Sequence, residues 1–191
     1  MANSYQKIII ITAPSGAGKT SVTRHLMQNF PKLAFSVSAA TRKARGNEKD
    51  GVDYHFISEA TFKEKIQHKE FAEWEMVYEG KYYGTLKSEL ERIWKENKIP
   101  VLDIDVKGAI HMQQQYPVNS LSLFIEPPSV EELKTRLESR GTETAESLAA
   151  RINKAAYELS FKEQFNKHII NDNLQRACAE AEKIVGEFLN P

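Results

Sequence analysis

A glycine-rich segment near the start of the chain, APSGAGKT at residues 13–20, has the residue types of a phosphate-binding loop. It matches the pattern G-x-x-x-x-G-K-[ST] except at its first position, where an alanine stands. Gly16 and Gly18 allow backbone N–H groups to turn toward one concavity. Lys19 can reach terminal phosphates, and the Thr20 hydroxyl is a ligand that Mg²⁺ accepts. The segment predicts a nucleotide-phosphate site. Its residues are Ala13, Pro14, Ser15, Gly16, Ala17, Gly18, Lys19 and Thr20.

Acidic residues end a second apolar run, VLDID at 101–105. Asp103 or Asp105 can hold Mg²⁺ through water, although acidic residues at the end of a strand also cap the next helix. The tetrapeptide DVKG at 105–108 matches the D-x-x-G of GTPase switches. A GTPase should also carry N-K-x-D for guanine, and this tetrapeptide is absent from the sequence. We therefore do not expect a GTPase.

A local basic cluster of Arg42, Lys43 and Arg45 lies in a chain whose 26 basic and 26 acidic residues cancel. Such a cluster suits a single phosphate monoester, although a solvated charged loop would have the same composition. Proteins that bind duplex nucleic acid by broad phosphate neutralisation usually carry excess basic charge, so we expect no nucleic-acid partner.

The elements that must position these residues alternate between strands and helices. Four short apolar runs predict buried strands, at 7–12, 100–105, 120–125 and 168–171. Helical patterns lie at about 19–29, 107–116, 129–139, 144–162 and 173–189. Ser129 with Glu132, and Asp172 with Gln175, have the spacing of helix N-caps. This alternation predicts an α/β fold with a parallel sheet flanked by helices.

The region at about 38–96 differs in composition from the rest. It is rich in aromatic residues, and MVYEGKYYG at 76–84 is a candidate hairpin with a glycine at its turn. We interpret the region as an insert with its own short mixed sheet and a helix near 59–69.

Length and composition bound the remaining possibilities. A chain of 191 residues with 41% hydrophobic and 27% charged residues is typical of one globular domain. The single cysteine, Cys178, excludes an internal disulfide and a cysteine zinc site, and we interpret it as an apolar helix residue. The five histidines lack paired metal-ligand spacing. The sequence shows no signal peptide and no stretch of about 20 apolar residues, so we expect a cytoplasmic protein without a membrane partner.

Taken together, the motifs resemble the guanylate kinase family over nearly the whole chain. The matching pieces are APSGAGKT, SVSAATRKARGNEKDGVDYHF, FAEWEMVYEGKYYGT, VLDID, PPSVEELKTRLESRGTE and IINDN. The resemblance implies a P-loop nucleoside-monophosphate kinase fold in three parts. These are a core at about 5–37, 97–126 and 163–191, a GMP-binding insert at about 38–96 and a helical lid at about 127–162.

The resemblance also implies a reaction and its residues. The enzyme would transfer phosphate from ATP, with Mg²⁺, to GMP or dGMP, giving ADP and GDP in purine nucleotide metabolism. The GMP phosphate would meet Arg42, Arg45, Tyr54 and Tyr83, and guanine would meet Ser38, Glu73 and Thr85. The lid arginines would be Arg136, Arg140 and Arg151, and Asn171 and Asp172 would lie near adenine. Catalytic roles would belong to Lys19, Arg42, Arg136, Arg140, Arg151 and Asp103, and Asp103 would also contact GMP.

Chemistry agrees with these assignments. Guanine presents N1–H and N2–H donors beside the O6 acceptor, so a carboxylate such as Glu73 can accept from both donors.

Two alternatives stay open at this point: a P-loop kinase for another nucleoside monophosphate, and a non-catalytic guanylate-kinase-like interaction module. Glu73 and Ser38 speak against the first. Lys19 and Thr20 speak against the second, as does the length, which we expect to leave no room for a partner domain.

Overall fold

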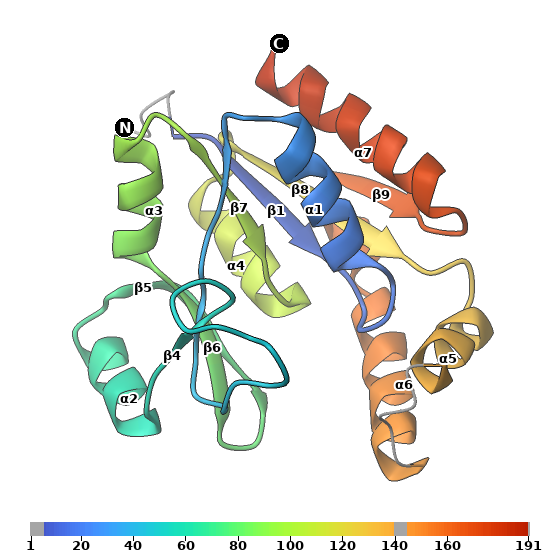
Figure 1. Cartoon of the computed structure of the whole chain (residues 1–191), viewed down its shortest axis with the longest axis horizontal. Helices are drawn as coiled ribbons and strands as arrows, with labels where there is room; N and C mark the ends of the chain where they lie inside the picture. The colour runs from blue at the N-terminus through green and yellow to red at the C-terminus, as the bar shows by residue number, and fades with distance from the viewer. Residues whose placement is uncertain (1–5, 140–144, 191) are drawn as a thin grey trace.

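The computed structural model describes residues 6–139 and 145–190. Its centre is a parallel sheet with the strand order β2-β7-β1-β8-β9 (Figure 1). The strands are β1 (Ile8–Thr12), β2 (Leu33–Phe35), β7 (Ile99–Asp103), β8 (Ser120–Glu126) and β9 (Lys167–Ile170). All four strands predicted from the apolar runs are present, and the predicted α/β fold is confirmed.

Helices cover both faces of this sheet (Figure 1). Helices α1 (Lys19–Asn29) and α7 (Leu174–Leu189) pack on the face that carries Ile9 and Ile11 of β1. Helices α3 (Lys87–Lys95) and α4 (Val106–Gln115) pack on the opposite face, with Ile8 and Ile10. Successive side chains of a strand point to opposite faces, so an uninterrupted apolar run such as β1 suits a strand that is buried on both sides.

A second sheet has the strand order β4-β3-β6-β5 and lies at one end of the first. Its strands are β3 (Ala39–Ala40), β4 (His55–Phe56), β5 (Phe71–Tyr78) and β6 (Lys81–Leu86). The predicted hairpin is formed by β5 and β6, with Gly80 at a φ of 67° in the turn. Helix α2 (Glu59–Gln67) covers the sheet through Phe62, whose ring stacks on Phe71 at 4.3 Å between centroids.

Two further helices, α5 (Val130–Glu138) and α6 (Ala145–Leu159), lie side by side at the other lower corner of the molecule in Figure 1. They pack through Leu133, Leu137 and Ala155. Ser129 caps α5 as predicted, because its Oγ accepts from the Glu132 N–H at 3.0 Å. The sequence also predicts that Gly141 ends this helix and that TET at 142–144 forms a link, but these residues lie outside the described residues. A short 3-10 helix, Lys162–Gln164, leads from α6 to β9.

The structure differs from the sequence predictions in three elements. Helix α3 and strand β2 were not predicted, because β2 has only three residues and α3 is strongly polar on its exposed side. The predicted N-cap Asp172 was wrong by one residue. Asn173 has the extended backbone of a cap, and its side chain accepts from the Arg176 N–H at 3.1 Å. The Asp172 carboxylate instead forms an ion pair with Arg176.

Two other sequence interpretations can be compared with the fold. Cys178 is buried in the core on α7, as expected for an apolar helix residue. Across residues 6–139 and 145–190, no helix is both long enough and apolar enough to cross a membrane.

Candidate functional site

The glycine-rich segment forms a loop between β1 and α1. Gly16 and Gly18 have φ values of 97° and 98°, which favour glycine. Gly18 is also crowded, since a Cβ there would lie 2.1 Å from Asn171 Nδ2. The Asn171 amide donates to the Ala17 carbonyl at 2.7 Å, so it holds the loop from the end of β9. Ala13 is not among the described non-glycine residues with positive φ, so its backbone does not require the glycine of the usual pattern.

Lys19, the first residue of α1, faces the carboxyl end of β7. Its Nζ lies 2.5 Å from Asp103 Oδ1 and donates to the Ile104 carbonyl at 3.2 Å. The strands β1 and β7 are paired with Ile11 opposite Asp103, which brings the loop and the acid together. Burial disfavours the charged amine, but the attraction and hydrogen bond of Asp103, together with Tyr54 and Asp105, outweigh it, so the pKa of Lys19 is raised above its ordinary value.

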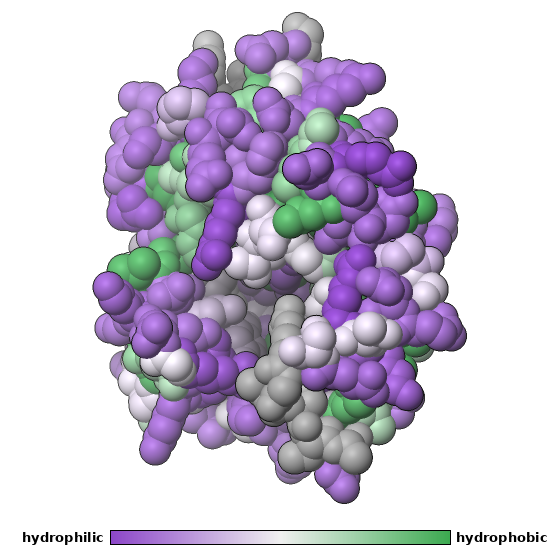
Figure 2. Space-filling view, turned by 45° about the vertical axis from the view of Figure 1, so that its right-hand side comes forward, coloured by the Kyte–Doolittle hydropathy of each residue, from purple (hydrophilic) through white to green (hydrophobic). Residues whose placement is uncertain are grey.

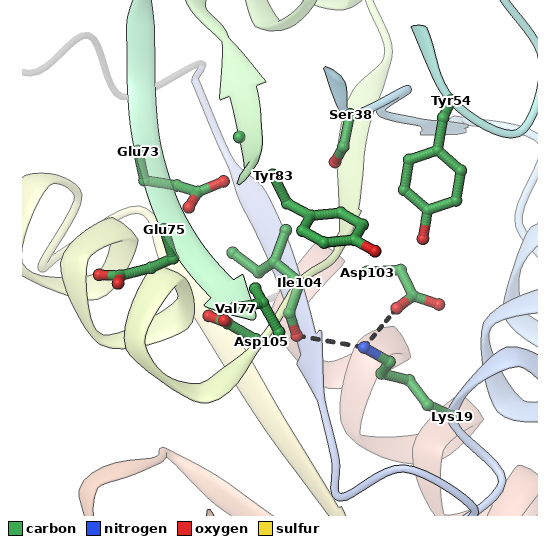
Figure 3. Close-up of a pocket in the computed structure, with 11 residues that line it drawn as sticks. Lys19, Ser38, Tyr54, Glu73, Glu75, Val77, Tyr83, Asp103, Ile104 and Asp105 are labelled. Carbon is green, nitrogen blue, oxygen red and sulfur yellow. Dashed lines mark hydrogen bonds and ion pairs between the residues drawn. The ribbon is translucent and has the colours of Figure 1, made fainter. Parts of the chain in front are cut away.

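An inner pocket of about 150 Å³ opens beside this ion pair (Figure 3). Figure 3 shows Glu73 at one end of the pocket and Lys19 at the other, with the ring of Tyr83 between them. Its walls come from β5, β6, the end of β7 and the loops before β3 and β4. The lining residues are Lys19, Ser38, Tyr54, Glu73, Glu75, Val77, Tyr83, Gly84, Asp103, Ile104 and Asp105.

Glu73 is the most unusual charged residue of this pocket. It is only 6% exposed, and its Oε1 accepts a 2.6 Å hydrogen bond from the Thr85 hydroxyl. Burial, with a smaller contribution from the Asp105 carboxylate, raises the pKa of Glu73 to about 7. Thr85 is fully buried behind Glu73. Its hydroxyl is therefore engaged with the carboxylate in this structure, whereas the sequence resemblance had it contact guanine.

An outer pocket of about 500 Å³ shares five lining residues with the inner one: Lys19, Tyr54, Val77, Asp103 and Asp105. It joins the loop at 13–21 to basic side chains from other elements, namely Arg42, Arg45, Arg151 and Lys154. The molecule is hollowed near the centre of the face seen in Figure 2, and mainly hydrophilic residues surround the hollow. Cationic side chains around a glycine-rich loop suit an anionic ligand such as a polyphosphate.

Arg42 is held by partners on three sides. Its guanidinium donates two hydrogen bonds to Glu48, at 2.5 and 2.7 Å, and one to the Tyr83 hydroxyl at 3.1 Å. It also lies over the Tyr54 ring, 4.8 Å from the centroid. The bond to Arg42 lowers the pKa of Glu48. Glu48 further accepts from the Arg45 N–H at 2.8 Å, so one carboxylate organises both arginines of the predicted cluster.

The predicted lid arginines do not share one location. Arg151 on α6 donates to the Ser15 hydroxyl at 3.0 Å and lines the outer pocket. Arg136 on α5 is instead bonded to Glu132 and to the Asn171 carbonyl, at 3.0 and 2.9 Å. Arg136 thus braces the end of β9, whereas the resemblance implied a catalytic role for it as a lid arginine. Arg140 lies outside the described residues.

A family model settles what this loop, these pockets and this sheet order belong to: the model for guanylate kinase matches residues 5–187. The chain belongs to the guanylate kinase family. The predicted family, its P-loop kinase fold and its class as a phosphotransferase are therefore confirmed, and the interaction-module alternative is not favoured.

Individual guanylate kinases support the same assignment. The guanylate kinase of Bacteroides fragilis is 47% identical over 183 residues, which cover 96% of this chain and 90% of that protein. That of Chlorobium chlorochromatii is 43% identical, covering 96% of both. A crystal structure of guanylate kinase from Anaplasma phagocytophilum superposes with a TM-score of 0.79 at 28% identity, covering 99% of this chain and 89% of that one.

Sequence reasoning missed three charged residues that line the outer pocket. Glu48 lies three residues after Arg45 in a charged loop, a pattern that looks like solvated surface. Lys154 follows Arg151 by one helical turn, so the two lie on one face of α6, and that spacing was a usable signal. Glu158, one turn further, is buried beside Lys154 at 3.5 Å and lines the outer pocket. Burial raises the pKa of Glu158.

Proposed function

We propose that this guanylate kinase family member transfers the terminal phosphate of ATP to GMP, or to dGMP, and releases ADP and GDP. The observation that carries the proposal is the inner pocket, because Lys19 of the phosphate-binding loop and the buried Glu73 line the same cavity. A phosphate-binding group and a base-recognising group at opposite ends of one pocket suit a nucleoside monophosphate as acceptor.

Base selection is assigned to Glu73 and to Ser38, which lines the same pocket. The ionised carboxylate accepts from the N1–H and the 2-amino group of guanine, while the Ser38 hydroxyl donates to O6. Adenine and the pyrimidines cannot satisfy this set, since they lack two adjacent donors beside an acceptor in that order. Thr85 supports the carboxylate from behind through its 2.6 Å hydrogen bond.

The acceptor phosphate is assigned to Arg42 and Arg45, with the hydroxyls of Tyr54 and Tyr83. Glu48 and Tyr83 already fix the plane of the Arg42 guanidinium before substrate arrives. Preorganised donors lose little rotational freedom on binding, so the phosphate is aligned at a small entropic cost. The bound acceptor then directs a phosphate oxygen toward the outer pocket.

The donor phosphates are assigned to the backbone of the loop at 13–20, to Lys19 and to Arg151. Transfer forms a bond from a GMP phosphate oxygen to the γ-phosphorus and breaks the bond to the β–γ bridging oxygen. The acceptor oxygen is already anionic, so alignment and charge neutralisation matter more than a strong base. Lys19 can leave Asp103 and follow the migrating group, because its ammonium is carried on a flexible four-carbon chain.

Magnesium fits the residues present. Thr20, Asp103 and Asp105 line the outer pocket with hydroxyl and carboxylate oxygens, and Mg²⁺ prefers one or two such ligands together with substrate phosphates. When bound, Mg²⁺ neutralises phosphate charge.

We also propose the division into a core, a GMP-binding insert at about 38–96 and a lid at about 127–162, with Asn171 and Asp172 near adenine. Asn171 would act there by positioning the loop, since its side chain holds the Ala17 carbonyl.

The test is ADP release in a coupled assay with GMP, AMP, CMP and UMP in parallel. We expect GMP to be used with by far the highest kcat/KM. Equal use of AMP would refute the base assignment, and no ADP release with any acceptor, from a protein that still binds ATP, would refute the proposed reaction.

A further inference from the structure

Glu73 lies close to helix α4 at Gly108. Gly108 is buried in the first turn of α4. A Cβ built on it would lie 2.5 Å from Glu73 Oε2 and 3.1 Å from Glu73 Cδ. Real Cβ contacts essentially never fall below 3.0 Å, so a side chain of any kind at this position would displace the Glu73 carboxylate. The two residues lie 35 positions apart in the chain, on β5 and on α4.

The backbone of Gly108 does not itself need a glycine. The residue is helical, and it is not among the described glycines with positive φ. Glycine is a poorer helix former than alanine, so its presence in α4 destabilises the helix slightly. Its N–H is already bonded to the Asp105 carboxylate, at 2.8 Å, as part of the helix cap. The close approach of Glu73 is the main feature that calls for glycine here, and Asp105 Oδ1 would lie 3.3 Å from the same Cβ.

Contacts on two sides fix the position of the Glu73 carboxylate. Its Oε1 accepts from the Thr85 hydroxyl at 2.6 Å, and its Oε2 lies where a Cβ on Gly108 would clash with it. On the β6 side, Gly84 is also packed closely, with a virtual Cβ 2.8 Å from the Glu73 carbonyl oxygen. The carboxylate plane is therefore set by Thr85 from one side and by the absence of a side chain on α4 from the other.

We propose that Gly108 is a positioning residue for base selection: the space left by its missing side chain lets the Glu73 carboxylate take the orientation that accepts from two adjacent base donors. The inference rests on the proposed function, in which Glu73 is the guanine ligand. Gly108 is not among the residues that line the inner pocket, so it acts through Glu73 and not by touching the substrate.

The test compares Gly108→Ala with a matched control, Gly186→Ala. Gly186 is also inside a helix, but the nearest atom to a Cβ there is Phe30 Cζ, at an ordinary 4.0 Å. For Gly108→Ala we expect the KM for GMP to rise by about tenfold or more, because a small misplacement of a binding group is costly. The KM for ATP should stay within about twofold and the thermal midpoint should not fall, because alanine favours the helix. Gly186→Ala should leave both KM values unchanged.

A base analogue gives a readout that a general structural defect would not move. IMP lacks the 2-amino group, so it can donate only once to the carboxylate. If Gly108 sets the orientation of that carboxylate, Gly108→Ala should lose more activity with GMP than with IMP, and the preference for GMP should shrink. A variant that lost GMP, IMP and ATP affinity in equal proportion would overturn the inference.

A double-mutant cycle separates this inference from the proposed function. Glu73→Gln alone should raise the KM for GMP, and adding Gly108→Ala to it should cost much less than in the wild type, because the two residues act as a unit. Full additivity would overturn the role of Gly108 and leave Glu73 in place. If Glu73→Gln used GMP as well as the wild type, the assignment of Glu73 would fail instead, whatever Gly108→Ala did.

Discussion

Lys19 Nζ lies 2.5 Å from Asp103 Oδ1, so the lysine of the phosphate-binding loop is neutralised by the neighbouring strand before any phosphate arrives. The pair explains how a partly buried cation is tolerated at the centre of the site, since removing a charge from water is costly unless the charge is paired. It also keeps Lys19 extended toward the place where phosphate charge is redistributed during transfer.

Lys19→Met should lower kcat by roughly two orders of magnitude or more, because a preorganised charge near the transferring group acts mainly on the transition state. The KM for GMP should change much less. Steady-state kinetics with circular dichroism as a folding control would measure this. Near-normal turnover in a folded Lys19→Met protein would contradict the role assigned to the loop.

The raised pKa of Glu73 predicts that the binding of GMP depends on pH. Its pKa is raised to about 7 in the ligand-free protein, and only the ionised carboxylate accepts from both guanine donors. The KM for GMP should therefore fall as the pH rises through about 7. In Glu73→Gln this step should disappear, while any titration of the GMP phosphate is common to both proteins.

The same shift has a consequence for stability. The pKa of Glu73 is higher in the folded protein than its ordinary value of 4.5. Its contribution to the stability of the fold is therefore fully present below about pH 4.5 and is lost as the pH rises through about 7. The thermal midpoint of Glu73→Gln, relative to the wild type, should consequently rise between about pH 5 and pH 8. A difference that did not change with pH would contradict the raised pKa.

Glu48→Gln should weaken the binding of GMP without affecting ATP. The substitution removes one anionic acceptor of the two Arg42 hydrogen bonds at 2.5 and 2.7 Å and weakens the hold on Arg45. A hydrogen bond to a charged group contributes roughly 1.5–3 kcal/mol, so the KM for GMP should rise by about tenfold. Glu64→Gln, at an exposed position of α2, is the control and should change neither KM. An unchanged KM for GMP in Glu48→Gln would show that Arg42 needs no support.

Arg151→Ala should lower kcat far more than it weakens GMP binding. Arg151 reaches the loop at Ser15 and lines the outer pocket, on the donor side of the site. Arginine contacts to transferring phosphates in related chemistry contribute about 10³-fold or more to the rate. Arg24→Ala, an exposed arginine on α1, should have no such effect. A loss confined to the KM for GMP would move Arg151 to the acceptor side.

Local patterns in the sequence were sufficient for the loop at 13–20, for the strands that precede Lys19 and Asp103, and for the Ser129 cap. Each depends on residues within one turn or one strand of each other, so periodicity and spacing along the chain carry the information. The family resemblance then pointed to the residues of the acceptor site by their order and spacing, although no single one of them was distinctive on its own.

Tertiary structure decided how those residues meet. Arg42 with Glu48 is a short-range case that a loop conformation determines, and Lys19 with Asp103 depends on the register of β1 against β7. The position of Glu73 between Thr85 and Gly108 depends on the packing of β5 against α4. In the sequence Gly108 matched part of a switch motif, but in the fold it lies next to a buried carboxylate. Burial and close approach between distant segments arise only when the sheets and helices are packed together, because no local property of a glutamate or a glycine specifies which one will lie against the other.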